Sequence, residues 1–259
     1  MLNYIKSELY RISHSKGIYI FNGVCAGLLL AMDVLLRLIW KSDHTFMYAN
    51  TAFAFNFASI FIGVVFILTI VMGCIAFGDE YKNKTLGNSI AFGSSPVKIY
   101  LGKAMVSLII SFASLAVVLA IFIGSSYLLL QNSGSEVLWE FLENYLVNSL
   151  ILVTGVLSTL TLCFLFGSGS AATWGWLILF RGLPIVCQLL GLKFPFFISL
   201  NKWMAAEIIG AQVSGNVDDL NIHWLWQTPD GLYRTLMAGA LGILVFFAIG
   251  IVGMRRKEI

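Results

Sequence analysis

Long apolar runs separated by short polar segments dominate the chain. A helix that crosses a bilayer needs about 20 mostly apolar residues, and six runs meet that length. The runs cover residues 17–40, 51–77, 99–130, 145–166, 171–190 and 235–254. The fourth and fifth are joined only by the polar stretch GSGS, so they predict two helices rather than one very long helix. We therefore expect an all-α integral membrane protein in which residues 1–259 form a single domain with six transmembrane helices.

Two segments outside these runs have an amphipathic pattern. In residues 1–16, apolar residues recur at helical spacing, which predicts a short helix lying in the membrane interface. These apolar positions are Leu2, Ile5, Leu9 and Ile12. The segment 191–234, between the fifth and sixth runs, begins apolar and contains three tryptophans typical of the interfacial aromatic belt. We expect it to form a helical segment on the outer side of the membrane.

Composition supports the membrane assignment. The chain is 59% hydrophobic and 11% charged, with a mean hydropathy of +0.88, whereas a soluble domain is about half apolar and a quarter charged. The net charge of +3 gives no indication of nucleic-acid binding. The four cysteines lie inside apolar runs and the three histidines are scattered, so we expect neither disulfides nor a metal site.

Positive charges predict the orientation of the six helices. Ten lysines and arginines fall on one side: Lys6, Arg11, Lys16, Lys82, Lys84, Lys98, Lys103, Arg255, Arg256 and Lys257. The other side has four, mixed with a larger number of acidic residues. Because cytoplasmic loops carry the excess of lysine and arginine, both termini are expected in the cytoplasm.

The loop between the second and third runs is the largest on that side. Asp79 and Glu80 stand where a helix would begin, which suits the helix dipole. Four less polar residues follow at helical spacing: Tyr81, Thr85, Leu86 and Ile90. Such a short amphipathic helix can pack in the headgroups under its own bundle or dock into a groove on a cytoplasmic partner. The periodicity alone leaves both interpretations open.

The amino-acid sequence of this loop, DEYKNKTLGNSIAFGSSPVKIYLGK, resembles the cytoplasmic loop of type-2 ABC exporter permeases. The matching positions are the acid–aromatic pair Glu80–Tyr81, then Thr85–Leu86, Ser95–Pro96 with Lys98, and the closing pair Gly102–Lys103. Lys84 stands where the family usually has glycine, and Asn88 stands near a usual basic position. The length and the order of the predicted elements also suit a small permease of the lantibiotic-immunity, bacitracin-resistance or peptide-toxin export type.

The resemblance implies a permease subunit of an ATP-driven exporter in a bacterial cell membrane, moving an amphipathic or hydrophobic substrate such as an antimicrobial or toxic peptide. Two permease subunits, identical or paralogous, would form the pathway, and separate ATPase subunits would bind ATP and Mg²⁺. The loop 79–98 would be the coupling helix, with ATPase contacts at Glu80, Tyr81, Lys84, Thr85, Leu86, Ile90 and Lys98. The sequence contains no Gly-x-x-x-x-Gly-Lys-Ser/Thr phosphate loop, so this chain is expected to be no enzyme and to bind no cofactor itself.

Three charged residues fall inside the predicted helices. Asp33 and Arg37 are four residues apart on the first helix, so they share a face and can pair with each other, or they can contact substrate. Arg181 lies near the middle of the fifth, where an arginine costs a few kcal/mol unless it faces a partner or water. We expect Arg181 to have a structural partner, with a polar cavity or a substrate contact as alternatives.

Two other functions deserve comparison. A transporter driven by an ion gradient would need intramembrane carboxylates, and Asp33 is the only candidate. An intramembrane enzyme would need paired carboxylates, or histidine with glutamate, at bilayer depth, and the nearest pair, Glu140 and Glu143, lies in a loop.

Overall fold

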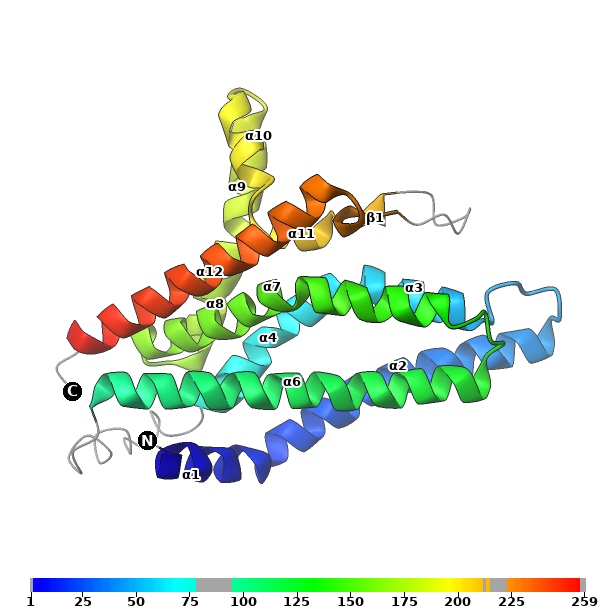
Figure 1. Ribbon diagram of the computed structural model, residues 1–259, viewed down its shortest axis with the longest axis horizontal. Helices are drawn as coiled ribbons and strands as arrows, with labels where there is room; N and C mark the ends of the chain where they lie inside the picture. The colour runs from blue at the N-terminus through cyan, green and yellow to red at the C-terminus, as the bar shows by residue number, and fades with distance from the viewer. Residues whose placement is uncertain (1, 78–94, 212, 215–222, 257–259) are drawn as a thin grey trace.

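A computed structural model describes residues 2–77, 95–211, 213–214 and 223–256 (Figure 1). Nearly all of the described chain is helical. The helices that precede residue 167 are α1 (Leu2–Ser13), α2 (Lys16–Ser42), α3 (Thr51–Ile60), α4 (Ile62–Phe77), α6 (Pro96–Leu129) and α7 (Glu136–Phe166). The later elements are α8 (Gly169–Leu177), η2 (Ile178–Gly182), α9 (Leu183–Gly191), α10 (Pro195–Asn201), α11 (Ala205–Gly210), β1 (Val213–Ser214), β2 (His223–Trp224), η4 (Leu225–Gln227) and α12 (Pro229–Arg256).

The apolar helices are long enough to cross a membrane, and the chain is an all-α, multi-pass integral membrane protein. Within the described residues, five spans meet the length and composition that a crossing requires: α2, α6, α7, the continuous segment 169–191 and α12. The pair α3–α4 becomes a sixth if it is counted as one span, although it is bent by 56°. The bend falls at Phe61, between Ser59 and Gly63, the kind of residues at which helices kink.

Two helices differ in extent or geometry from the ranges that hydropathy indicates. α7 begins at Glu136 rather than at residue 145, because its first turns carry acidic residues that hydropathy excludes but that favour a helix N-terminus. The fifth run contains the short π-helix η2 between α8 and α9. Both differences arise from local backbone geometry that an apolar count does not register.

α7 is the central helix of the bundle. It packs chiefly against α12 and α4 and is buried along most of its length. Threonine hydroxyls on α7 donate hydrogen bonds across to backbone carbonyls of α12: Thr154 to Gly239 at 2.9 Å and Thr161 to Phe246 at 3.1 Å. Interhelical hydrogen bonds of this kind help to hold helices together in a membrane, where apolar contact alone gives little preference for protein over lipid.

The two ends of the bundle differ in what they contain. Figure 1 shows α1, the start of α6 and the last turn of α12 at the same end, which we name the terminal end. At the opposite end, the first residue of α3 is fastened to the segment that follows α6, since Thr51 N–H donates to the Gln131 carbonyl at 2.9 Å. There, hydrogen bonds from the Thr45 hydroxyl and amide hold the pKa of the Asp43 carboxyl below its usual range.

The segment between the fifth and last spans contains the short helices α10 and α11, followed by the strands β1 and β2 and the short helix η4. α9 and α10 form a hairpin that projects from one side of the other helices (Figure 1). α11 packs back against α12 and α4, and β1 pairs with β2 in an antiparallel two-stranded ribbon.

Candidate functional site

A buried ionic cluster at the terminal end joins three helices that are distant in sequence. Glu8 on α1 is 4% exposed, and Lys103 on α6 is fully buried. Lys103 Nζ donates to Glu8 Oε2 at 3.0 Å, and Arg11 Nη2 donates to the same oxygen at 2.8 Å. Both cations also contact the backbone carbonyl of Ala76, at 3.5 Å from Lys103 and 3.1 Å from Arg11. We name these four residues the Glu8 cluster.

The position of Ala76 explains why two cations meet there. Ala76 lies in the last turn of α4, where backbone carbonyls have no partner within the helix and the helix dipole is negative. The Lys103 and Arg11 side chains donate to that carbonyl and both form ion pairs with the carboxylate of Glu8. The cluster therefore fastens α1 and α6 to the C-terminal end of α4.

Apolar packing reinforces the cluster. Ile12 of α1 lies in a small core with Ile18, Ala76 and Val106. Gly102 provides room for the ring of Tyr4, because a Cβ at Gly102 would lie 2.6 Å from Tyr4 Cδ1. Gly102 and Lys103, the closing pair of the loop motif, thus both hold α1 against α6.

The sequence pattern predicted an interfacial helix with Leu2, Ile5, Leu9 and Ile12 on its apolar face, a set that does not include Glu8. In the structure Glu8 is buried on the same face as Ile5 and Ile12, which are three residues before it and four residues after it. That spacing is readable from the sequence, whereas its partner Lys103, 95 residues away, is not.

In the sequence, the predicted ATPase contacts all lie between Ala76 and Lys103, two members of this cluster. Six of them lie outside the described residues: Glu80, Tyr81, Lys84, Thr85, Leu86 and Ile90. The seventh, Lys98, is exposed in the first turn of α6. α6 begins with Ser95 as N-cap, whose hydroxyl accepts from the Lys98 amide at 3.4 Å, and with Pro96 in the first turn, where proline is favourable. The Glu8 cluster therefore holds the two helices that border residues 78–94.

A second polar contact connects α6 to the rest of the bundle. Tyr100 is fully buried one turn before Lys103, and its hydroxyl lies 3.0 Å from Thr161 Oγ1 on α7 and 3.4 Å from the Phe246 carbonyl on α12. Its ring lies so close to Gly250 that a Cβ there would be 2.2 Å from Tyr100 Cζ. The start of α6 is thus linked to α1 and α4 on one side and to α7 and α12 on the other.

Asp33 and Arg37 do not form the ion pair that their spacing allows. Asp33 is fully buried and accepts hydrogen bonds from the hydroxyls of Ser125 and Ser126 on α6, the latter at 2.9 Å. The Arg37 guanidinium instead lies 4.7 Å from the centre of the Trp40 ring, a cation–π contact. Asp33 therefore joins α2 to α6. These hydrogen bonds do not test the alternative that Asp33 contacts the substrate.

Arg181 is exposed on the π-helix η2. The structure records no ion pair or hydrogen bond for its side chain within the described ranges, so the expected partner within this chain is not found there. Two neighbours on the exposed face of this span, Ile178 and Ile185, are also exposed. The arginine therefore lies on an outward-facing apolar surface of the single chain.

In the part of the chain that the structure describes, no three histidine, cysteine or acidic side chains lie close enough together to bind a metal ion.

Comparison with known protein families identifies the family of the chain. A family model described as "ABC-2 family transporter protein" matches residues 4–182, which extend from α1 to the end of η2. No protein of curated function and no solved structure matches the chain significantly.

Proposed function

Because the chain belongs to the ABC-2 family of transporter proteins, and is thus a membrane component of an ABC transporter, we propose that it is the permease subunit of an ATP-driven exporter powered by separate ATPase chains. The Glu8 cluster is the observation that carries this proposal. It joins α1 to the end of α4 and to the first turns of α6, the two described helices that precede and follow residues 78–94 in the chain.

The proposed ATPase docks on the loop 79–98 and contacts Glu80, Tyr81, Lys84, Thr85, Leu86, Ile90 and Lys98. ATP and Mg²⁺ bind to that partner, whose closure pushes the loop. Removing one member of a buried ion pair costs about 3–5 kcal/mol, so α1, α4 and α6 resist separation and move together. Tyr100 carries the displacement on to α7 and α12.

The terminal end faces the cytoplasm of a bacterial cell in this proposal. Basic residues support this orientation: Lys6, Arg11, Lys98, Lys103 and Arg255 all belong to the segments at that end. Cytoplasmic segments carry such an excess of lysine and arginine. An ATPase in the cytoplasm can reach the loop only in this orientation.

A second permease subunit, identical or paralogous, completes the pathway. Arg181 supports this part of the proposal, because an arginine within an apolar span is costly in lipid and is stabilised by a partner chain or by a water-filled path. The cargo is amphipathic or hydrophobic, of the antimicrobial or toxic peptide class, and moves outward; the loop resemblance supports this assignment.

Purification of the detergent-solubilised protein from its native membrane tests the proposal. The wild-type chain is expected to carry an ATPase with it, and Leu86→Asp in the loop is expected to lose that partner while still eluting as a folded protein. Glu140→Ala is the matched control, since Glu140 is exposed on α7 away from the loop and should leave the partner bound. An ATPase retained equally by all three proteins, or absent from all three, contradicts the proposal.

A further inference from the structure

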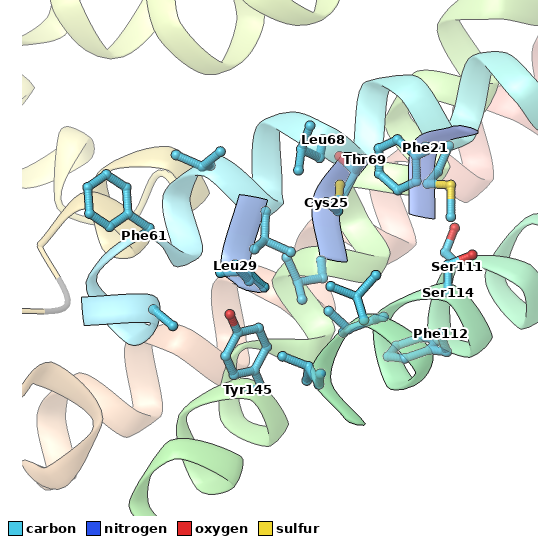
Figure 2. A pocket seen from close by; sticks show the side chains of 18 of the residues that line it. Phe21, Cys25, Leu29, Phe61, Leu68, Thr69, Ser111, Phe112, Ser114 and Tyr145 are labelled. Atoms are coloured by element: carbon cyan, nitrogen blue, oxygen red, sulfur yellow. The ribbon is translucent and has the colours of Figure 1, made fainter. Parts of the chain in front are cut away.

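The bend in the second span leaves a cavity of about 240 Å³ between α2, α4, α6 and α7. Figure 2 shows side chains converging on it from all four helices, with Leu29 from α2, Leu68 from α4, Ser114 from α6 and Tyr145 from α7. α2 packs mainly along α6 and touches α4 much less. Because α3 and α4 diverge by 56° at Phe61, the space beside α4 is not filled by α2.

The lining is that of a hydrocarbon site. None of the lining residues is charged, and nearly all are aliphatic or aromatic. Four lining residues carry a hydroxyl: Thr69, Ser111, Ser114 and Tyr145. That of Thr69 donates to the Phe66 carbonyl at 2.6 Å, and that of Ser111 is buried with no hydrogen-bond partner among the described residues. The rest of the wall consists of aliphatic and aromatic side chains and the thiol of Cys25, so the site suits a mainly apolar occupant.

One side of the cavity is closed and the other is open. On the closed side Met72, Leu152 and Val156 are 3–7% exposed. On the open side Leu28, Phe61 and other large side chains line the cavity and are also exposed at the surface, Leu28 by 68% and Phe61 by 47%. These helices are spans, so the opening leads into the lipid rather than into water.

Size selects among apolar occupants. An engineered cavity of about 150 Å³ with similar walls stays dry and binds benzene, so 240 Å³ is ample for a segment of hydrocarbon chain. An empty cavity of that size is destabilising. The molecules with a hydrocarbon chain that meet the open side at the highest concentration are the phospholipids of the bilayer.

We propose that this cavity is a lipid site that holds one acyl chain of a membrane phospholipid between α2 and α4. The site concerns the membrane domain alone and does not depend on the ATPase, so either proposal can fail without the other.

Photo-crosslinking in a reconstituted bilayer tests the site. The full chain is placed in nanodiscs of phosphatidylcholine containing a small fraction of phosphatidylcholine with a diazirine group on one acyl chain, irradiated, and mapped by mass spectrometry. The diagnostic residues are Leu152 and Val156 on the central helix, because lipid can reach them only through the cavity. Label on both is expected.

Two neighbouring valines on α6 give a matched pair of variants. Val118 lines the cavity and is 8% exposed, whereas Val117 does not line it and is 50% exposed. Val118→Phe should fill the space and lower the labelling of Leu152 and Val156 by about tenfold, a change that corresponds to about 1.4 kcal/mol. Val117→Phe should leave it unchanged.

The wild-type map alone can overturn the proposal, even if Val118→Phe fails to fold. Label confined to outward-facing residues such as Leu28, with none on α7, would show that no acyl chain enters. Equal labelling of α7 in the two phenylalanine variants would show that the label arrives by another route. Absence of lipid label from Leu28 and Phe61 as well as from α7 would assign the opening to a second copy of the chain and reject the lipid.

Discussion

The ammonium of Lys103 and the carboxylate of Glu8 lie 3.0 Å apart and are both buried, although 95 residues separate them in the chain. Placing two charges in an apolar setting is favourable only when each is paired and hydrogen-bonded. The cluster meets this condition with Arg11 and the Ala76 carbonyl. The cluster joins the helices on either side of the proposed docking loop. A displacement of that loop is therefore expected to move α1, α4 and α6 as one unit.

Removal of Lys103 is the strongest perturbation of this unit. Lys103→Met leaves Glu8 buried with Arg11 as its remaining charged partner in the cluster, and the expected cost is about 3–5 kcal/mol. For a chain of this size the melting temperature in detergent should fall by on the order of 10 °C. The double variant Glu8→Met/Lys103→Met should lose less than the sum of the two single variants, because no buried charge of the pair then remains uncompensated.

An exposed ion pair in the same chain is the control for that measurement. Arg234 and Asp230 lie 3.2 Å apart, with the Asp230 side chain 89% exposed. Arg234→Ala should change stability by only a few tenths of a kcal/mol. A melting temperature for Lys103→Met that matches that of Arg234→Ala would show that the Glu8 cluster does not stabilise the terminal end.

Gly250 is expected to tolerate no side chain. Gly250→Ala places a methyl group against the Tyr100 ring, which is fixed between Thr161 and the Phe246 carbonyl, so the melting temperature should fall by several degrees. Gly27→Ala is the matched control, since a Cβ at Gly27 has nothing within 4 Å in this chain. Equal melting temperatures for the two alanine variants would show that α12 does not pack on Tyr100 in this way.

Asp33 distinguishes ATP-driven from gradient-driven transport. Asp33→Asn retains a side-chain oxygen that can accept from Ser125 and Ser126, so folding should change little and export should persist. The measurement is the rate at which cells export the transported substrate. It is made for the wild-type protein and for Asp33→Asn, with and without an ionophore that collapses the proton gradient. Loss of export in a folded Asp33→Asn protein would instead support an ion-coupled carboxylate and count against the ATP-driven account.

Arg181→Leu is expected to act on assembly rather than on the fold of the single chain. The side chain is exposed and no partner is recorded for it in the described segments, so the thermal stability of the monomer should stay the same or rise. The fraction of paired permease subunits, measured by size exclusion with light scattering in mild detergent, should fall. A less stable monomer with unchanged pairing would place the partner of Arg181 within this chain.

Hydropathy alone predicted the membrane class and the approximate places of the apolar helices, because a bilayer requires long apolar runs. It missed the 56° bend at Phe61, since Ser59 and Gly63 interrupt neither length nor hydropathy. The loop motif predicted the ABC family, which the family match confirms. The pairing of Asp33 with serines rather than with Arg37 depends on which face of α6 meets α2, and local spacing on one helix cannot predict that contact.

Site-specific photo-crosslinking at the loop tests the central claim most directly. Lys98, which is exposed at the start of α6, and Leu86 in the loop are each replaced by a photoreactive phenylalanine analogue, and the intact cells are irradiated. The same analogue at the exposed Glu140, on α7 away from the loop, is the control. The account predicts a covalent adduct with an ABC ATPase at the first two positions and none at Glu140. An absence of ATPase adducts at both loop positions, with the protein folded and in the membrane, would contradict it.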